Sequence, residues 1–325
     1  MSRRSLECVV IGGGAAGFFG AIACAEANPH AYVTLLEAGR EPLTKVRISG
    51  GGRCNVTHAC FDAATLVQHY PRGGKALRGA FTRFQPNDTI RWFAEHGVRL
   101  HTEADGRMFP TTNDSATIVD CLTEAARQAG VEIKTSRPVV AVRAVDEGFA
   151  IELKTGATLT CDRLLLATGS SPQGHRLAQG LGHQIEPPVP SLFTFNIADP
   201  HLHALAGVSV ESAHLRLQLS EGKPLEQTGA VLITHWGLSG PAVLKLSAWG
   251  ARSLHDHRYR GTLWVNWLPS SSADQIRQVL SETKTQHGKK AIATFNPLPL
   301  PRRLWHYLGD RSAIAQETRW ADLSK

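Results

Sequence analysis

Several features that mark other protein classes are missing from this sequence. The 325 residues contain no apolar run long enough to cross a membrane, so we expect no transmembrane segment and no membrane partner. Internal repeats and low-complexity tracts are also absent, which argues against a solenoid or fibrous protein. Charged residues make up only 19% of the chain, which is low for a disordered or nucleic-acid-binding tail.

The cysteines lack any pattern of a disulfide framework or a zinc site. No C-x-x-C pair occurs, and the thiols are spread through predicted helices and strands. We therefore expect reduced cysteines, no metal site and a cytoplasmic location. The six positions are Cys8, Cys24, Cys54, Cys60, Cys121 and Cys161.

Long basic runs are missing as well, although the chain carries a net charge of +7. Basic residues occur at most in pairs, such as Lys289–Lys290 and Arg302–Arg303. A positive surface suits an anionic cofactor or an acidic substrate, and it also attracts RNA without specificity. We expect a small-molecule substrate and no specific nucleic-acid partner; nothing in the sequence indicates the oligomeric state.

What is present is a glycine-rich turn between an apolar strand and an Ala-rich helix. Gly12 permits the tight turn, Gly14 lets the backbone approach phosphates, and Gly17 lets helix and strand pack closely. The helix over 15–27 presents unpaired N–H groups and the positive end of its dipole. This order of elements predicts a site for the pyrophosphate of a dinucleotide.

A carboxylate follows at the position that a ribose needs. The second strand, over 32–37, ends at Glu37, 20 residues after Gly17. An acid at this point accepts hydrogen bonds from a ribose 2′-hydroxyl and repels a 2′-phosphate. Lys45 lies shortly after it and either reaches the phosphate or ribose of the ADP half or is a solvated surface lysine.

A second glycine cluster, residues 50–55, predicts a second cradle for the cofactor. Three consecutive glycines let the backbone lie flat against a ligand. Arg53 either offsets pyrophosphate charge or steers the fold of the loop, and Asn55 either bonds the flavin or caps the loop. Cys54 is interpreted as a thiol packed as a small apolar group rather than a redox thiol.

Further elements predict a doubly wound α/β domain. Strands are expected over 131–133 and 164–169, and a helix is expected to run from an N-cap at Ser115 to about Gln128. Residues 138–161 alternate as a three-stranded meander, which is typical of FAD domains rather than simple NAD domains. The run over 164–169 is predicted to be a central, buried strand, at whose end ligands bind.

The residues predicted to contact the cofactor combine these motifs. Val139, at the head of the meander, either contacts the adenine or is an ordinary core residue. The full set is Gly12, Gly13, Gly14, Ala15, Ala16, Gly17, Glu37, Lys45, Gly51, Gly52, Arg53, Cys54, Asn55, Val139, Thr168 and Gly169.

A Pro-rich break over 186–190 marks a candidate domain boundary. Beyond it, strands are predicted over 192–197, 213–219, 229–235 and 261–267, and helices over 272–285 and 301–323. His235, beside Trp236 and the turn Gly237–Pro241, is the only catalytic candidate. It either supplies a proton at neutral pH or hydrogen-bonds loop backbone and fixes a domain interface.

Taken together, these motifs resemble the YhiN/BaiN-type FAD-dependent oxidoreductases, also described as aminoacetone-oxidase-type flavoproteins. The resemblance runs from residue 7 to the end of the chain, and the most specific element is Ser-Gly-Gly-Gly-Arg-Cys-Asn over 49–55. It implies an FAD-binding Rossmann-like domain (1–190), an inserted β-barrel-like domain (191–270, incomplete) and a helical insert (271–325, truncated). Family members continue further, so the resemblance implies a C-terminally truncated or degenerate member.

Three functions follow as alternatives. The first is an FAD-dependent oxidoreductase acting on an unidentified small organic substrate. No second glycine fingerprint is present, so NAD(P)H either docks transiently at the flavin face as the electron donor or is not used. The second is a flavin-poor, non-catalytic scaffold, and the third is a flavin-dependent RNA-modifying protein.

Overall fold

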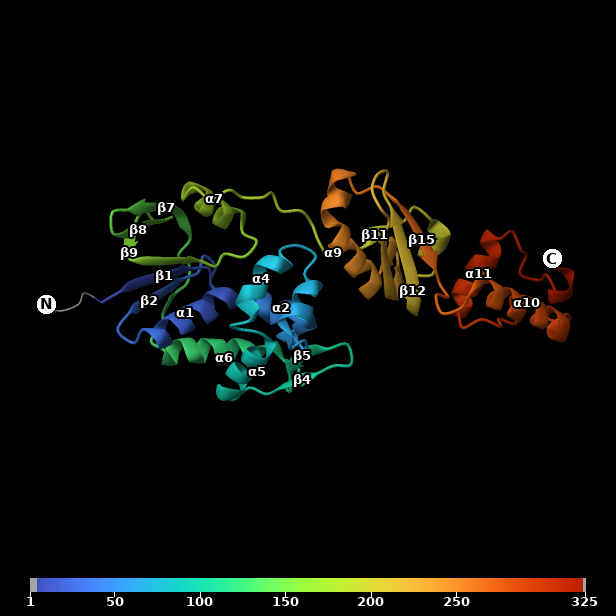
Figure 1. Cartoon of the computed structure of the whole chain (residues 1–325), viewed down its shortest axis with the longest axis horizontal. Helices are drawn as coiled ribbons and strands as arrows, with labels where there is room; N and C mark the ends of the chain where they lie inside the picture. Colours follow the sequence, from blue (N-terminus) through green and yellow to red (C-terminus); the bar gives the residue numbers. More distant parts are fainter. Residues whose placement is uncertain (1–4, 324–325) are drawn as a thin grey trace. The chain divides into compact units, whose positions relative to one another are not determined.

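The computed structural model describes residues 5–323 (Figure 1). It divides into two compact units, Met1–Glu186 and Pro187–Lys325, which are described separately. The division falls within the Pro-rich break at residues 186–190. In the described part of the chain, no helix combines the length and apolarity needed to span a bilayer.

The first unit is built on a parallel four-stranded sheet with the strand order β10-β1-β2-β6. Side chains alternate along β1, so Cys8 and Val10 face one layer whereas Val9 and Ile11 face the other. This double burial explains the nearly continuous apolar sequence of the strand. The strands are β1 (Glu7–Ile11), β2 (Tyr32–Leu36), β6 (Glu132–Lys134) and β10 (Arg163–Leu166).

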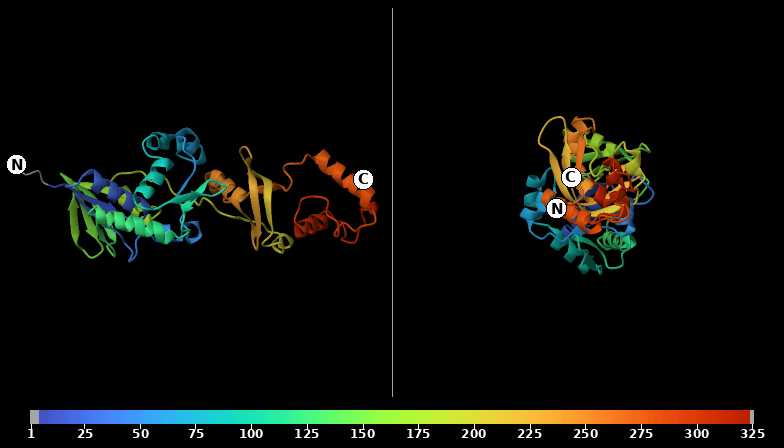
Figure 2. Two further views of the ribbon diagram at one scale, coloured as in Figure 1. Left: turned by 90° about the horizontal axis from the view of Figure 1, so that it is seen from below. Right: turned by 90° about the vertical axis from the view of Figure 1, so that its right-hand side faces the viewer.

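Different layers cover the two faces of this sheet. Helices α1 (Ala15–Ala27) and α6 (Ser115–Gln128) pack on one face and lie side by side (Figures 1 and 2). The opposite face carries an antiparallel meander and one helix. These elements are β7 (Val139–Val145), β8 (Gly148–Leu153), β9 (Thr158–Cys161) and α7 (Pro172–Gly180). The expected α/β fold with a β-meander is confirmed.

Two local predictions for this unit were wrong. The strand over 164–169 was expected at the centre of the sheet, but β10 lies at its edge and Leu165 is 42% exposed. The N-cap of α6 is Asp114, whose side chain accepts a hydrogen bond from the Ala116 amide at 2.8 Å. Ser115 is the first helical residue instead, and its hydroxyl donates to the Arg47 carbonyl at 2.6 Å.

A set of short elements lies between β2 and α6. Three strands form a small antiparallel sheet in the order β3-β5-β4. The elements are α2 (Thr44–Gly52), β3 (Thr57–His58), α3 (Ala63–Leu66), the 3₁₀ helix η1 (Val67–His69), α4 (Gly74–Phe81), α5 (Pro86–Glu95), β4 (Leu100–Thr102) and β5 (Arg107–Pro110).

The second unit contains a five-stranded antiparallel sheet with the strand order β11-β14-β13-β12-β15. Helix α9 packs against β13 and β12 on one face. The strands are β11 (Phe195–Asn196), β12 (Ser209–Gln218), β13 (Leu225–Thr234), β14 (Gly237–Ser239) and β15 (Thr262–Asn266). The helices are α8 (Pro200–His203), α9 (Pro241–Asp256), α10 (Ala273–His287), α11 (Arg302–Arg311) and the 3₁₀ helix η2 (Trp320–Asp322).

Helix α9 was missing from the predicted elements, although it supplies much of the core of this unit. The sequence Gly240-Pro241 reads as the end of a turn, whereas in the structure Gly240 is the N-cap, with φ 98°, and Pro241 opens the helix. Val243 and Leu246 are fully buried against the sheet. The helix therefore depends on its packing against β13 and β12.

Truncation of Leu246 tests this dependence. Leu246→Ala is expected to destabilise the second unit by about 2–5 kcal/mol, because it leaves a cavity in a closely packed core. Lys245→Ala, one residue away and exposed, serves as the matched control and is expected to change stability by less than about 0.5 kcal/mol. Urea unfolding followed by tryptophan fluorescence measures both; equal effects of the two variants would contradict the assigned role of α9.

Candidate functional site

A cavity of about 950 Å³ opens at the carboxyl ends of β1, β2 and β10. Open α/β sheets bind their ligands at this edge. The lining residues are Gly12, Gly13, Gly14, Ala15, Ala16, Phe19, Glu37, Glu41, Leu43, Thr44, Lys45, Val46, Ser49, Cys54, Asn55, Val56, Phe84, Thr89, Phe93, Ile118, Leu122, Leu166, Ala167, Thr168 and Gly169.

Two positions of the glycine turn leave no room for a side chain. A Cβ on Gly17 would lie 1.8 Å from the Gly12 carbonyl oxygen, and a Cβ on Gly12 would lie 2.5 Å from the Ala167 carbonyl oxygen. Gly12 also has a φ of 113°, which other residues rarely adopt. Gly17 thus serves the packing of α1 on β1 and does not line the cavity.

Gly14 differs from these two glycines because it borders open space. A Cβ built on it would meet no atom within 4 Å. Gly14 is the N-cap of α1, no side chain caps the helix, and its first turn contains no acid. The first N–H groups of α1 therefore face the cavity at the positive end of the helix dipole, which is the arrangement that binds a phosphate.

Glu37 fastens the turn to the end of β2. Its Oε2 accepts a hydrogen bond from the Gly13 amide at 2.7 Å, and its Oε1 accepts one from the Gly39 amide at 2.7 Å. Each carboxylate oxygen can accept a further bond, so a ribose hydroxyl can still bind there. The residue expected to bind ribose also shapes the phosphate turn.

Lys45 crosses from α2 to the segment after β10. Its Nζ donates to the Ser170 hydroxyl at 3.0 Å, and its side chain lines the cavity. Thr168 and Gly169 line the same cavity. The Lys45 ammonium group can contact a bound phosphate in place of the Ser170 hydroxyl.

The second glycine cluster is a left-handed loop packed against β5. Gly50, Gly51, Gly52 and Cys54 have φ values of 58°, 70°, 85° and 60°. A Cβ on Gly50 would lie 2.9 Å from the Phe109 ring, so glycine is required there. Cys54 and Asn55 line the cavity, whereas Gly51 and Gly52 are exposed and do not.

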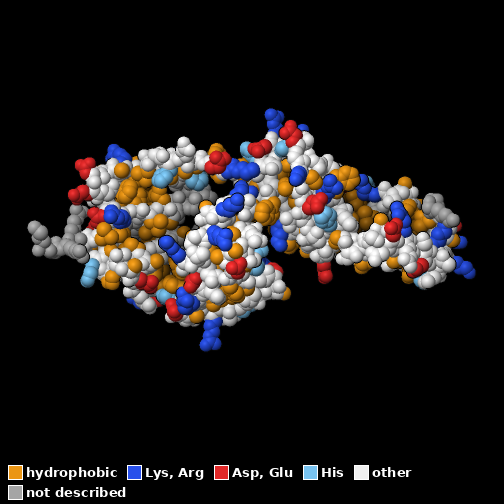
Figure 3. Space-filling view, in the orientation of Figure 1, with side chains coloured by type: hydrophobic (Ala, Val, Ile, Leu, Met, Phe, Trp, Pro, Cys, Tyr) orange, Lys and Arg blue, Asp and Glu red, His pale blue; other side chains and the backbone are white. Residues whose placement is uncertain are grey.

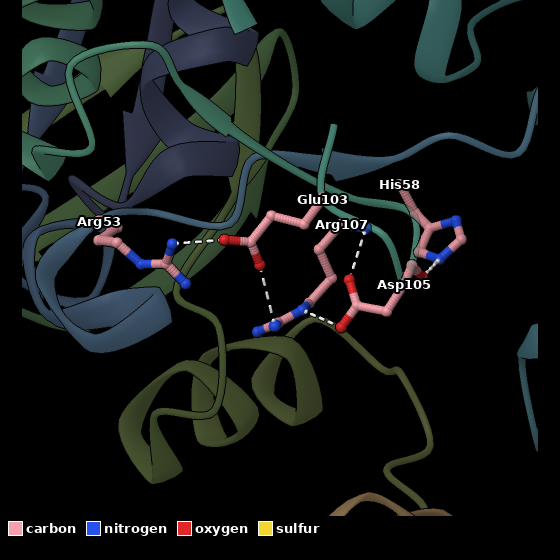
Figure 4. A network of polar contacts seen from close by, with 5 residues as sticks. All are labelled: Arg53, His58, Glu103, Asp105 and Arg107. Carbon is pink, nitrogen blue, oxygen red and sulfur yellow. Dashed lines mark hydrogen bonds and ion pairs between the residues drawn. The ribbon is translucent and has the colours of Figure 1, made fainter. Parts of the chain in front are cut away.

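The Arg53 side chain belongs to a polar network on the small sheet and does not line the cavity (Figure 4). Its Nη1 lies 2.6 Å from Glu103 Oε1, and its guanidinium stacks 4.0 Å from the centre of the Phe109 ring. Glu103 also binds Arg107 at 3.0 Å, and Arg107 binds Asp105 at 2.7 Å. Of the two roles considered for Arg53, these contacts fit the one that steers the loop.

Cys54 is buried at the cavity wall, and burial raises the pKa of its thiol. A raised pKa keeps the sulfur protonated at neutral pH, which disfavours a thiolate role in redox chemistry. All six cysteines are free, so Cys54 and Cys60 form no disulfide. Within residues 5–323, no group of three or more His, Cys, Asp or Glu side chains is placed to hold a metal ion.

The apolar wall of the cavity was not predicted from the sequence. Phe19 comes from α1, Phe84 from the segment before α5, Phe93 from α5, and Ile118 and Leu122 from α6. The pair in α6 lies at i, i+4 spacing, which places both side chains on one helix face. The sequence predicts that this face of α6 is buried, but it does not indicate that the face borders a ligand cavity.

Two predicted residues, Val139 and His235, are not among the residues that line this cavity. Val139 is buried in the core between the sheet and the meander, as in its ordinary core interpretation. His235 lies in the turn between β13 and β14 of the second unit, beside Trp236, whose Nε1 donates to the Thr194 hydroxyl at 3.3 Å. The catalytic role of His235 stays a prediction.

Comparison with known families agrees with this geometry. The model of the HI0933-like protein Rossmann domain matches residues 6–253, and that of the HI0933-like protein barrel and H2TH domain matches residues 189–325. The chain belongs to the HI0933-like family. The resemblance to YhiN/BaiN-type flavoproteins is confirmed, and this member is an FAD-dependent oxidoreductase.

Three curated relatives match most of this HI0933-like chain. A protein of Escherichia coli K12 named ribosomal RNA dihydrouridine synthase is 29% identical over 310 residues, covering 92% of this chain and 72% of the relative. One of the same name from Haemophilus influenzae is 28% identical, covering 100% and 79%. The 3-dehydro-bile acid delta(4,6)-reductase of Clostridium scindens is 29% identical, covering 97% and 79%.

Substitution of Glu37 tests the glycine turn as the ADP site. Glu37→Gln replaces one accepting oxygen by a donor that faces a backbone N–H, so FAD binding should weaken about tenfold or more. Glu41→Gln makes the same change in a second acid that lines the cavity, and it should bind FAD as the unmodified protein does. Fluorescence quenching during FAD titration measures both; unchanged binding by Glu37→Gln would contradict this role.

Proposed function

We propose that this member of the HI0933-like family reduces a carbon–carbon double bond conjugated with a carbonyl group, with NAD(P)H as the source of electrons. The names of the relatives support this choice. Dihydrouridine differs from uridine by two hydrogens across a ring double bond conjugated with a carbonyl, and a 3-dehydro bile acid with 4,6-unsaturation is a conjugated ketone. The two substrates share a carbon–carbon double bond conjugated with a carbonyl group and little else of their structures.

The single observation that carries the proposal is the cavity at the amino end of α1. We assign the pyrophosphate of FAD to the uncapped N–H groups of Gly14, Ala15 and Ala16 and the adenosine ribose to Glu37. Lys45 supplies a positive charge in the lining of the same cavity. Bound there, FAD supplies hydride-transfer chemistry.

The protein's own contribution is to position reactants and exclude water. Phe19, Phe84 and Phe93 give part of the cavity an apolar wall, where a flat conjugated ring packs well. Overall, the substrate gains one hydride equivalent from the nicotinamide and one proton from an acid or from water. No dedicated nicotinamide fingerprint is present in the sequence, so we assign NAD(P)H to transient binding.

Flavin oxidation kinetics test the proposal. The purified chain with FAD is reduced anaerobically by NADPH or NADH and then mixed with 2-cyclohexen-1-one or with ribosomal RNA. Return of the oxidised flavin spectrum, with two hydrogen atoms added to the acceptor by mass spectrometry, is the expected result. Cyclohexanone, which lacks the double bond, is the control.

Other outcomes of the same experiment decide against the proposal. Reoxidation by oxygen alone, with neither acceptor consumed, would indicate an oxidase. Failure to bind FAD at all would favour the flavin-poor scaffold.

We further propose that His235 supplies the proton. His235→Gln should lower kcat by about 100-fold or more and remove the limb of the pH–rate profile that reports the acid, because general acids contribute factors of this size. His255→Gln, at an exposed histidine of α9, is the control. An unaltered pH profile in His235→Gln would instead support a role in fixing loop structure.

A further inference from the structure

Residues 70–84, here called the basic segment, run through α4 to the edge of the cavity beside the glycine turn. They include four Lys and Arg residues and no Asp or Glu. Blue side chains gather over α4 in the space-filling view (Figure 3). The cations are Arg72, Lys75, Arg78 and Arg83, and all four are exposed.

The acids that flank the basic segment do not balance this charge. The pKa of Asp62 is lowered by hydrogen bonds from Thr65 and by the nearby charge of Arg78. Asp88 pairs with Arg91 at 2.6 Å, outside the segment. The segment therefore keeps a net positive charge.

Two aromatic side chains are exposed among these cations. Tyr70 is 40% exposed, and its Cβ lies 3.6 Å from where a Cβ on Gly74 would stand, so it lies against the first turn of α4, next to Lys75. Phe84 is 42% exposed and packs edge-on against Phe19 at 5.3 Å. Aromatic faces stack on nucleotide rings while cations contact the phosphates. Since α4 contains no buried residue, core packing does not account for this pattern.

The basic segment also leads into the cavity. Phe84 lines the cavity together with Phe19 and the glycine turn. Helix α4 is about 12 Å long, since each of its eight residues adds about 1.5 Å. An extended dinucleotide with one ring at Phe84 can therefore lie along α4 and place its other end near Lys75.

The proposed reductant is a dinucleotide that lacks a phosphate-binding turn of its own. The glycine turn over residues 12–17 is assigned to FAD, and the sequence contains no second glycine fingerprint. A nicotinamide coenzyme must therefore find cations for its phosphates elsewhere. NADPH carries a 2′-phosphate that NADH lacks, and Lys and Arg side chains are the groups that bind it.

We infer that the basic segment binds NADPH in preference to NADH. Lys75 and Arg78, one turn apart on α4, contact the 2′-phosphate, and Tyr70 stacks on the adenine. Arg83 contacts the pyrophosphate, and the nicotinamide lies at Phe84. The inference rests on the proposed function, for which it names the coenzyme and the surface that binds it.

The exposed position of this surface suits a coenzyme that must leave after each reaction. The nicotinamide of NADPH gives one hydride to the flavin, and water supplies the proton that completes the two-electron reduction. The coenzyme departs as NADP+, and the surface is then free for the next NADPH.

Isothermal titration calorimetry of the FAD-loaded chain with NADP+ and NAD+ tests the inference without turnover. The unmodified protein should bind NADP+ about tenfold or more tightly than NAD+. Lys75→Gln/Arg78→Gln should lose this preference by weakening NADP+ about tenfold while NAD+ binding stays the same. Arg83→Gln should weaken both by the same factor, because both contain the pyrophosphate.

Arg143→Gln/Lys154→Gln removes two exposed cations from the meander and is the matched control. It should bind both coenzymes as the unmodified protein does. The FAD content of every variant is measured in parallel, so that a loss of coenzyme binding is separated from a loss of flavin.

Equal affinities of the unmodified protein for NADP+ and NAD+ would overturn the inference. So would an undiminished preference for NADP+ in Lys75→Gln/Arg78→Gln. ATP has as many phosphates as NADP+ but no 2′-phosphate. Binding of ATP as tight as that of NADP+ would indicate a general attraction of anions and would also overturn the inference.

The proposed function is scored in a separate experiment. The flavin is reduced by dithionite, with no nicotinamide coenzyme present, and is then mixed with 2-cyclohexen-1-one. Consumption of the double bond reports the proposed reduction. The coenzyme surface can therefore fail while the proposed function stands, and the proposed function can fail while NADP+ still binds.

Discussion

The contact between Gly17 and Gly12 is the constraint on which the first unit depends. With no Cβ on Gly17, helix α1 approaches so closely that its first turn points directly at the carboxyl edge of the sheet. Glu37 then fixes the turn from the other side through the Gly13 and Gly39 amides. The uncapped end of α1 and the cavity beside it follow from these contacts.

Some residues of the glycine motifs face the cavity, whereas others support its structure. Gly14 borders open space, whereas Gly12, Gly17 and Gly50 border backbone or a buried ring. Arg53 is one of the supporting residues, because its guanidinium forms an ion pair with Glu103 and stacks on the Phe109 ring. Consecutive residues of one motif therefore have different roles: some face the ligand cavity, and others hold the loop in place.

Much of the first unit could be predicted because its signals are local. The strand, glycines, helix and acid of residues 7–37 follow each other at fixed spacing, and the meander alternates with period two. The edge position of β10 could not be predicted, because the apolar sequence of a strand does not indicate whether it pairs with one neighbouring strand or with two. Helix α9 was missed because Gly240-Pro241 indicates a turn as readily as a helix start. The apolar cavity wall depends on α1, α5 and α6 meeting in space, which no local pattern records.

The central claim is that the amino end of α1 and Glu37 hold the ADP half of FAD. A crystal structure of the chain grown with FAD tests this claim most directly. We expect density for the pyrophosphate against the Gly14, Ala15 and Ala16 amides, and a ribose hydroxyl that is hydrogen-bonded to Glu37. An FAD molecule bound elsewhere, or a cavity filled by protein side chains, would contradict it.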